Sequence, residues 1–148
     1  MYDALIEVQV MAMRLACGGM SAQRLAEYLV EQPGVGRVRY PGLASDPQYA
    51  LARSQMSDFG GVVTFDLTGG AEAGRRFAEA LELFAITPSL GSTESLVVAP
   101  QMLGVRELTP EQVRSSAVTP GTVRLSIGLE DPDDLLEDVR RALAAAAG

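Results

Sequence analysis

The first hydrophobic pattern along the chain is helical. Between Ala4 and Val30, apolar residues recur near the 3.6-residue period of an α-helix, which predicts a helix over this stretch. These residues are Leu5, Val8, Met11, Leu15, Leu25 and Leu29. Gly18 and Gly19 interrupt the pattern, and since an interior glycine costs about 1 kcal/mol relative to alanine, we expect a bend or a break there.

Alternating patterns further along predict strands. From Gly60 to Leu67 every second residue is apolar, as in a half-buried strand. From Thr122 to Gly128, Val123, Leu125 and Ile127 share one face, which leaves Arg124 on the other face between Thr122 and Ser126. We expect shorter strands at Arg37 to Tyr40, Phe84 to Thr87 and Ser95 to Val98, the last two being separated by a turn over residues 89–92.

Two more helices complete the pattern. One is expected from about Ala71 to Leu83, with an apolar stripe formed by Ala73, Phe77, Ala80, Leu81 and Phe84. The other begins with Asp131 as N-cap and Pro132 at the first position, with acidic residues in its first turn. Its buried face is expected to hold Leu135, Leu136, Val139, Ala142 and Leu143.

This order of elements predicts an α+β fold in which a mostly antiparallel sheet is covered by helices on one face. With 148 residues and 47% hydrophobic residues, the chain suits a single domain over residues 1–148. No repeat, low-complexity linker or second domain is apparent.

Charge and composition exclude several functions. The net charge is −7 and the arginines form no stripe, so nucleic acid and anionic membranes are poor candidate partners. No stretch approaches the roughly 20 apolar residues of a membrane span, and Met1 is followed by no basic flank typical of a signal peptide, so we expect a cytoplasmic protein. Cys17, the single cysteine, is expected to be an inert small hydrophobe in a helix.

Two residue types that often take part in catalysis are missing from the sequence. It contains no histidine, and all twelve basic residues are arginine, so it contains no lysine. Histidine-based catalytic triads and imidazole metal sites are therefore excluded. A Schiff-base lysine is excluded as well.

Taken singly, the candidate site residues have ordinary structural explanations. Arg124 is most simply a solvated charge on the outer face of a strand. The acidic residues Glu130, Asp131, Asp133 and Asp134 stand where helix capping and the helix dipole favour them, so we do not expect an acid/base pair. The paired glycines match no phosphate-binding motif. The serines of the 89–95 turn lack a histidine or lysine that could activate them.

Together, however, these segments resemble a known family. Residues 89–96 (SLGSTESL), Pro100, residues 123–131 (VRLSIGLED) and Asp134-Leu135 resemble the C-terminal signature of the trans-sulfuration enzymes, which depend on pyridoxal phosphate and act in cysteine and methionine metabolism. They include cystathionine γ-synthases and lyases, methionine γ-lyases and O-acylhomoserine sulfhydrylases. Further matches are Arg14, Tyr40-Pro41-Gly42-Leu43, Asp46-Pro47, Ala50-Leu51-Ala52, Gln55-Met56 and Gly60-Gly61.

The resemblance implies a fold and a site. The fold would be that of the small C-terminal domain of fold-type I pyridoxal-phosphate enzymes. By resemblance, Arg124 binds the α-carboxylate of the substrate and Ser89 lies beside the same carboxylate. Pro88 would line the side-chain pocket, where an apolar residue suggests a substrate without a distal ammonium group.

The chain also departs from the family. The cofactor-binding large domain is absent, Met102-Leu103-Gly104-Val105 replace the expected Met-Thr-His stretch, and residues 17–20 differ from the usual charged run. Because the chain has no lysine, it cannot form the internal aldimine or abstract the substrate α-proton in the family's way.

Three interpretations stay open. The chain is one half of a split lyase or γ-replacement enzyme, forming a hetero-oligomer with a partner chain that carries pyridoxal phosphate and the catalytic lysine. In that case the methionines of the first helix suit an adaptable docking face, although core packing explains them equally well. Alternatively, it is a non-catalytic module that binds amino acids or docks to proteins, or it is a fragment of a full-length enzyme.

Overall fold

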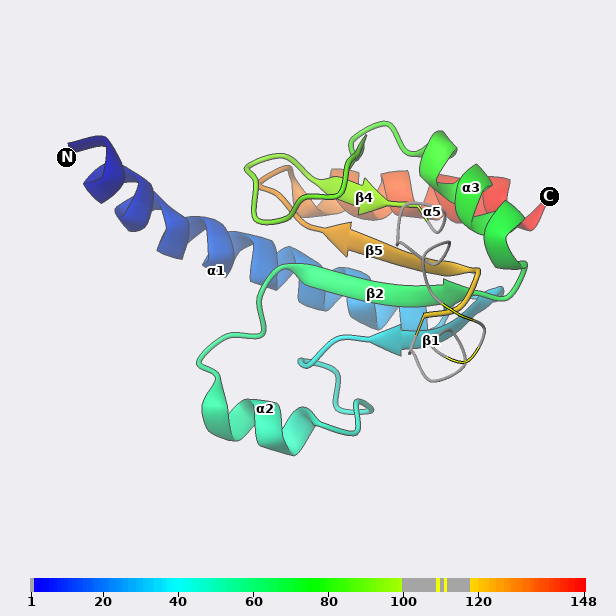
Figure 1. Ribbon diagram of the computed structural model, residues 1–148, viewed down its shortest axis with the longest axis horizontal. Helices are drawn as coiled ribbons and strands as arrows, with labels where there is room; N and C mark the ends of the chain where they lie inside the picture. The colour runs from blue at the N-terminus through cyan, green and yellow to red at the C-terminus, as the bar shows by residue number, and fades with distance from the viewer. Residues whose placement is uncertain (1, 100–108, 110, 112–117) are drawn as a thin grey trace.

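The computed structural model describes residues 2–99, 109, 111 and 118–148, and for residues 2–9 it describes the backbone only. Its elements, shown in Figure 1, are α1 (Tyr2–Val30), β1 (Val35–Arg39), α2 (Tyr49–Gln55), β2 (Val62–Leu67), α3 (Gly70–Ala80), β3 (Ala85–Ile86), β4 (Leu96–Val98), β5 (Thr122–Ser126) and α5 (Pro132–Ala147). The predicted α+β class is confirmed.

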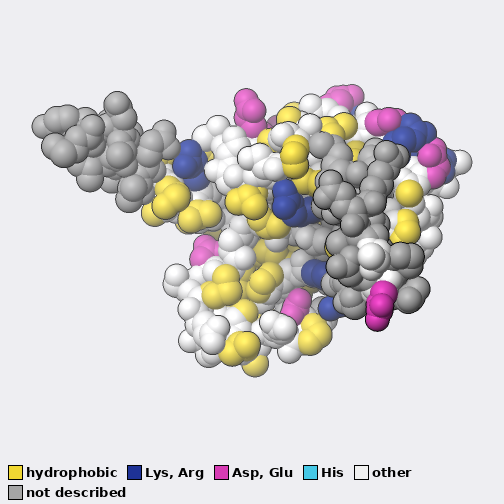
Figure 2. Space-filling model, in the orientation of Figure 1, with side chains coloured by type: hydrophobic (Ala, Val, Ile, Leu, Met, Phe, Trp, Pro, Cys, Tyr) yellow, Lys and Arg dark blue, Asp and Glu magenta, His cyan; other side chains and the backbone are white. Residues whose placement is uncertain are grey.

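The strands form one sheet in the order β1-β2-β5-β4-β3. Every neighbouring pair is antiparallel except β3 and β4, which are parallel. Helices α1 and α5 pass behind the sheet in Figure 1, and α3 packs on α5, so these three helices cover one face. The opposite face, called the outer face below, is turned toward the viewer in Figures 1 and 2.

The core lies between the sheet and these helices. Strand β2 contributes Val63 and Phe65, β5 contributes Val123 and Leu125, and all four side chains are fully buried. The ring of Phe65 meets that of Phe77 from α3 edge-on, with 5.4 Å between their centroids, a favourable aromatic arrangement. The predicted alternation of β2 and β5 is therefore confirmed.

Helix α1 is continuous for 29 residues, so the expectation of a break at Gly18 and Gly19 is wrong. These glycines allow close contacts instead. A Cβ atom at Gly18 would lie 2.9 Å from the carbonyl oxygen of Ile127, and one at Gly19 would lie 2.6 Å from the carboxylate of Asp58. Packing against neighbouring segments offsets the low helix propensity of glycine here.

The remaining helix predictions need two corrections. Cys17 lies in α1 as expected, but its side chain is exposed and does not pack as a core hydrophobe. Helix α3 ends at Ala80, short of the predicted Leu83, although Leu81 and Phe84 are buried as expected. No helix within the described ranges is long and apolar enough to cross a membrane.

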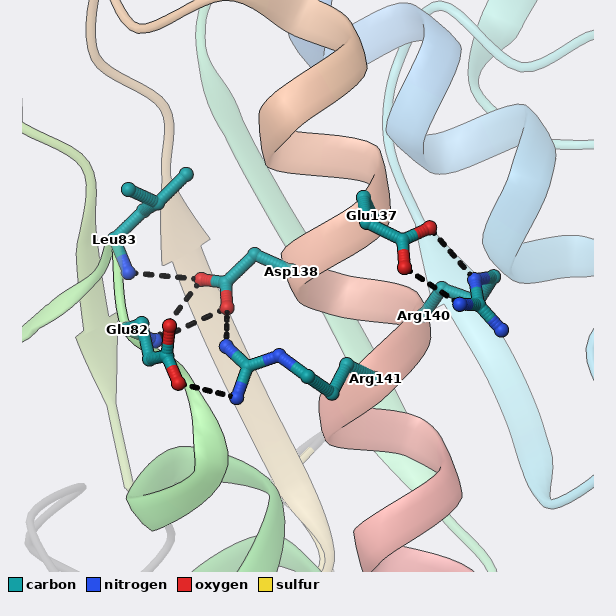
Figure 3. A network of polar contacts seen from close by, with 6 residues as sticks. All are labelled: Glu82, Leu83, Glu137, Asp138, Arg140 and Arg141. Atoms are coloured by element: carbon teal, nitrogen blue, oxygen red, sulfur yellow. Dashed lines mark hydrogen bonds and ion pairs between the residues drawn. The ribbon is translucent and has the colours of Figure 1, made fainter.

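A buried carboxylate explains the early end of α3. Asp138 on α5 is 4% exposed and accepts hydrogen bonds from the backbone N–H groups of Glu82 (3.0 and 3.1 Å) and Leu83 (2.9 Å), as Figure 3 shows. It also pairs with Arg141. The sequence pattern missed this polar position on the buried face of α5, where Leu136 and Leu143 are only half-buried.

Tyr40 follows β1 and ties α1 to the start of β2. It is 1% exposed, and its hydroxyl lies 2.9 Å from the carbonyl oxygen of Gly60 and 3.2 Å from that of Gly19. Burial raises the pKa of Tyr40 to about 12, with a smaller contribution from the carboxylates of Asp58 and Glu27.

Replacing Asp138 tests its structural role. In Asp138→Ala the N–H groups of Glu82 and Leu83 lose a charged acceptor, so the free energy of unfolding should fall by about 3 kcal/mol in urea denaturation. Glu137→Ala is the matched control, because the neighbouring Glu137 is exposed and pairs only with Arg140 among the described side chains. Equal stability of the two variants would contradict this role of Asp138.

Tyr40→Phe should change both stability and its pH dependence. Loss of the hydroxyl should lower the free energy of unfolding by about 1 kcal/mol at pH 7. Between pH 10 and about 12 the unfolded chain loses the Tyr40 proton while the folded chain keeps it, so the wild type loses stability as pH rises. Tyr40→Phe does not lose stability in this way. The difference in free energy of unfolding between the wild type and the variant should therefore become smaller between pH 10 and about 12. Since the chain has no lysine, few other groups titrate there. Parallel pH curves would contradict the raised pKa.

Candidate carboxylate-binding site

The segment between β3 and β4 folds over the outer face of β5. Its residues Ser89–Ser95 are called the tethered loop below. Five of the first six are exposed, and the last, Ser95, is fully buried. Gly91, with a φ of 73°, adopts the left-handed conformation that glycine tolerates best. Arg124 and Ser126 of β5 both point to this face, because they alternate with the core residues Val123 and Leu125.

Two contacts hold the first half of the tethered loop to β5. Nη2 of Arg124 donates a hydrogen bond to the carbonyl oxygen of Ser89 at 3.0 Å. Two residues further along both segments, the backbone N–H of Gly91 donates to Oγ of Ser126 at 3.1 Å. The structure therefore brings Arg124 and Ser89 together across 35 residues of sequence.

Arg124 is half-buried, so its description as a fully solvated charge is wrong. Its Nε atom is buried and has no hydrogen-bond partner among the described residues. Within the same part of the chain, no carboxylate lies at ion-pair distance from its guanidinium. An arginine whose N–H groups are not all hydrogen-bonded can bind a carboxylate by donating two parallel hydrogen bonds to it.

Of the other predicted site residues, Ser89 contacts this guanidinium through its carbonyl oxygen, and no contact of Pro88 with it is seen in the described part of the chain. Ser89 is exposed, and its backbone N–H is bonded to the carbonyl oxygen of Thr87 at 2.9 Å. Pro88 is exposed and precedes Ser89 directly. Their roles toward a substrate stay predictions.

The second half of the tethered loop is held by Glu130. Its carboxylate accepts from the backbone N–H of Ser95 at 2.7 Å and from the Ser95 hydroxyl at 2.8 Å. The same hydroxyl accepts from the N–H of Gly128 at 2.9 Å, and the N–H of Leu129 donates to the carbonyl oxygen of Thr93 at 2.9 Å.

The acidic cluster at residues 130–134 therefore has several roles, which corrects the expectation that it serves the helix terminus alone. Asp131 is the predicted N-cap and accepts from the N–H of Asp133 at 2.8 Å. Asp133 also pairs with Arg24 of α1 at 2.5 Å. Glu130 lies just before the cap and turns back to the tethered loop. Sequence reasoning missed this role because the partner lies 35 residues away.

An ion pair on the outer face was also missed. Asp66 of β2 pairs with Arg39 of β1 at 2.6 Å, and both side chains are less than one fifth exposed. Asp66 further accepts from the hydroxyls of Thr119 and Thr122. In the sequence, the one indication of this ion pair was that Asp66 lies on the polar face of the predicted β2 strand. Asp66 is thus satisfied by these donors and forms no ion pair with Arg124.

A pocket of about 290 Å³ opens beside the tethered loop. It is lined by Met11 and Leu15 of α1, by Leu90 and Gly91 of the tethered loop, and by Ser126 of β5. The surface around it is apolar, and Figure 2 shows hydrophobic side chains along α1 beside the grey residues and over α2. Met13 and Met20 of α1 are 69% and 66% exposed.

Comparison with known proteins identifies the family. The profile of the family "Cys/Met metabolism PLP-dependent enzyme" matches residues 5–144. L-methionine gamma-lyase of Pseudomonas putida is 54% identical over 127 residues, which are 86% of this chain and 32% of that protein. O-succinylhomoserine sulfhydrylase of Pseudomonas aeruginosa is 41% identical, over 93% of this chain and 34% of that protein.

Solved structures agree with the sequence comparison. Cystathionine gamma-lyase from yeast superimposes with a TM-score of 0.86 at 37% identity, covering 92% of this chain and 35% of the yeast chain. The chain thus spans about a third of the length of the relatives it matches. On these grounds it belongs to the family of pyridoxal-phosphate-dependent enzymes of cysteine and methionine metabolism.

Proposed function

We propose that this chain supplies the α-carboxylate site of a pyridoxal-phosphate-dependent enzyme that cleaves or replaces a carbon–sulfur bond of an amino acid, in assembly with a polypeptide that carries the cofactor. The proposal rests on how the guanidinium of Arg124 is placed. It is oriented by the Ser89 carbonyl, and no carboxylate of the described residues pairs with it.

The geometry suits an amino-acid carboxylate. The hydrogen bond from Nη2 to Ser89 fixes one edge of the planar guanidinium, so its remaining N–H groups point in defined directions. A carboxylate bound by two parallel donors cannot rotate freely, and this orients the rest of the amino acid. The exposed hydroxyl of Ser89 is a further donor at the same place.

The residues of this chain do not fit a covalently held cofactor. Pyridoxal phosphate is held in such enzymes as an imine with a lysine amine, and the chain contains no lysine. Within this proposal the cofactor and the group that removes the α-proton therefore come from another polypeptide. Arg124, Ser89 and Pro88 bind and orient the substrate.

The names of the relatives suggest the substrate class. They include a methionine γ-lyase and an O-succinylhomoserine sulfhydrylase, that is, enzymes named for an elimination and for a replacement at the γ-carbon. Neither methionine nor O-succinylhomoserine carries an ammonium group beyond the α-carbon. The apolar Pro88 beside Ser89 suits such a side chain, since it offers no carboxylate to a distal ammonium group.

The exposed apolar surface of α1 supports assembly with a partner. Exposed hydrophobic side chains normally occur singly on a monomer, whereas clustered ones mark interfaces. Here Met11 and Leu15 are exposed on one face of α1, and Met13 and Met20 are exposed on the opposite face. A chain that spans about a third of its relatives fits both a natural subunit and a fragment, and in either case this surface is where the missing cofactor-bearing part is expected to pack.

Reconstitution tests the role of Arg124. We would co-express this chain with the part of P. putida L-methionine γ-lyase that it does not match, and measure thiol release from L-methionine. Arg124→Ala should lower kcat/KM by about 100-fold or more, because it removes charge-assisted hydrogen bonds to the carboxylate. Arg124→Lys should recover only part of the activity, since it lacks the planar fork.

Arg140→Ala is the matched control, because Arg140 lies on α5 and pairs with Glu137. Assembly is checked by co-purification and by the absorption of the cofactor. An assembled complex in which Arg124→Ala retains full activity would contradict the proposal. Failure to assemble with any cofactor-bearing polypeptide would favour the non-catalytic binding module.

The apolar surface leads to a separate prediction. The purified chain alone should self-associate, with a sedimentation coefficient that rises with concentration. Met13 and Met20 are seven residues apart and so share one face of α1. The double variant Met13→Glu/Met20→Glu should shift the protein toward monomer, while Leu51→Glu, an equally non-conservative change at an exposed site on α2, should not. A wild-type chain that stays monomeric at all concentrations would count against obligate pairing.

A further inference from the structure

We infer that Glu130 is a positioning residue for the carboxylate site: by holding Ser95 it fixes the tethered loop so that the Ser89 carbonyl meets Arg124. The inference rests on the proposed role of Arg124 and adds a residue that contacts neither the guanidinium nor a substrate bound to it. Its basis is the set of contacts between the tethered loop and residues 124–130.

The contact between Arg124 and Ser89 does not hold the loop by itself. It is a single hydrogen bond at the exposed start of the loop, where Pro88, Ser89 and Leu90 are all exposed. A single exposed hydrogen bond is weak, because water competes for both groups. The order of this end therefore depends on further contacts, which are made by Thr87 just before the loop and by the rest of the loop itself.

Glu130 provides the strongest of these contacts. Both carboxylate oxygens accept from the same residue, one from the backbone N–H and one from the hydroxyl of Ser95, at 2.7 and 2.8 Å. Hydrogen bonds to an ionised acceptor are roughly twice as strong as neutral ones. Ser95 is fully buried, so these bonds are shielded from water.

The network around Ser95 is closed. The N–H of Gly128 donates to Oγ of Ser95, and that hydroxyl in turn donates to Glu130 two residues further along the chain from Gly128. Donors and acceptors in such a chain polarise and strengthen one another. Removing the carboxylate leaves a buried hydroxyl and a buried N–H without their acceptor, so the loop loses its anchor at this point.

Steric contact reinforces the anchor. A Cβ atom at Gly128 would lie 2.5 Å from the carbonyl oxygen of Thr93 and 2.6 Å from the carbonyl carbon of Glu94. The loop backbone therefore rests directly on the backbone that follows β5. Going back along β5 from Gly128, Ser126 contacts Gly91 and Arg124 contacts Ser89, so the contacts are spaced two residues apart on the strand. The position of Ser89 is thus set from two sides. One is the Ser95 end of the loop; the other is Thr87, whose N–H donates to the carbonyl oxygen of Val97 at 3.1 Å and whose carbonyl oxygen accepts from the N–H of Ser89 at 2.9 Å.

Amide hydrogen exchange of the full chain, followed by NMR, tests the anchor without a partner. In Glu130→Ala the amides of Gly91 and Ser95 should exchange at least about tenfold faster than in the wild type, because the loop opens locally. The exchange rates of the Phe65 and Leu125 amides in the core strands should change by less than about threefold. Glu137→Gln, which removes an exposed carboxylate on α5, is the control and should leave both sets unchanged.

Kinetics of the reconstituted enzyme test the consequence for binding. Glu130→Ala should raise KM for L-methionine by about tenfold and change kcat by less than about threefold, as expected when ground-state and transition-state binding are lost equally. Glu130→Gln should restore part of the loss, since its amide oxygen still accepts from the Ser95 N–H. A variant that only destabilised the fold would instead lower the active fraction, and so kcat, at unchanged KM.

The outcomes separate the inference from the proposed function. If Arg124→Ala impairs the enzyme and Glu130→Ala leaves KM unchanged, the inference is wrong and the proposed function stands. If exchange rises equally in the loop and in the core strands, Glu130 is a general stabilising residue and the inference is also wrong. If Arg124→Ala has no effect, the proposed function fails, and the exchange data still decide whether Glu130 anchors the loop.

Discussion

The alternation of side chains along β5 separates the core of the molecule from its outer face. Val123 and Leu125 are buried against the helices, so Arg124 and Ser126 must point to the outer face. Both outward side chains bind the tethered loop. The strand thus serves the core and the candidate site at once, and a one-residue shift in its pairing would turn Arg124 into the core.

The sequence predicted those parts of the fold that depend on local patterns. The alternation of β2 and β5 and the Asp131 cap need only a few adjacent residues, and the structure confirms them. Arg124 and Ser89 were identified as a pair through the family resemblance, because nothing in the composition connects them. Asp138, Glu130 and Asp66 were missed or assigned another role, since each has partners more than 25 residues away in the chain. Periodicity contains no information about such contacts.

The glycines of α1 illustrate the same limit. Judged by helix propensity alone, Gly18 weakens a helix. In the structure, its missing side chain lets α1 approach the carbonyl oxygen of Ile127, directly after β5. This approach places Met11 and Leu15 beside the tethered loop and forms one wall of the pocket there. A residue that looks like a helix breaker therefore determines how close the first helix lies to the candidate site.

Keeping an arginine available for a ligand is difficult in a chain with nineteen acidic residues and twelve basic ones. A free carboxylate nearby would pair with Arg124 and compete with the substrate. Among the described residues, two acids in this part of the structure are satisfied by other donors. Asp66 is held by Arg39 and two threonine hydroxyls, and Glu130 is held by Ser95. The same hydrogen bonds that stabilise the outer face thus leave the guanidinium of Arg124 with donors for an incoming carboxylate.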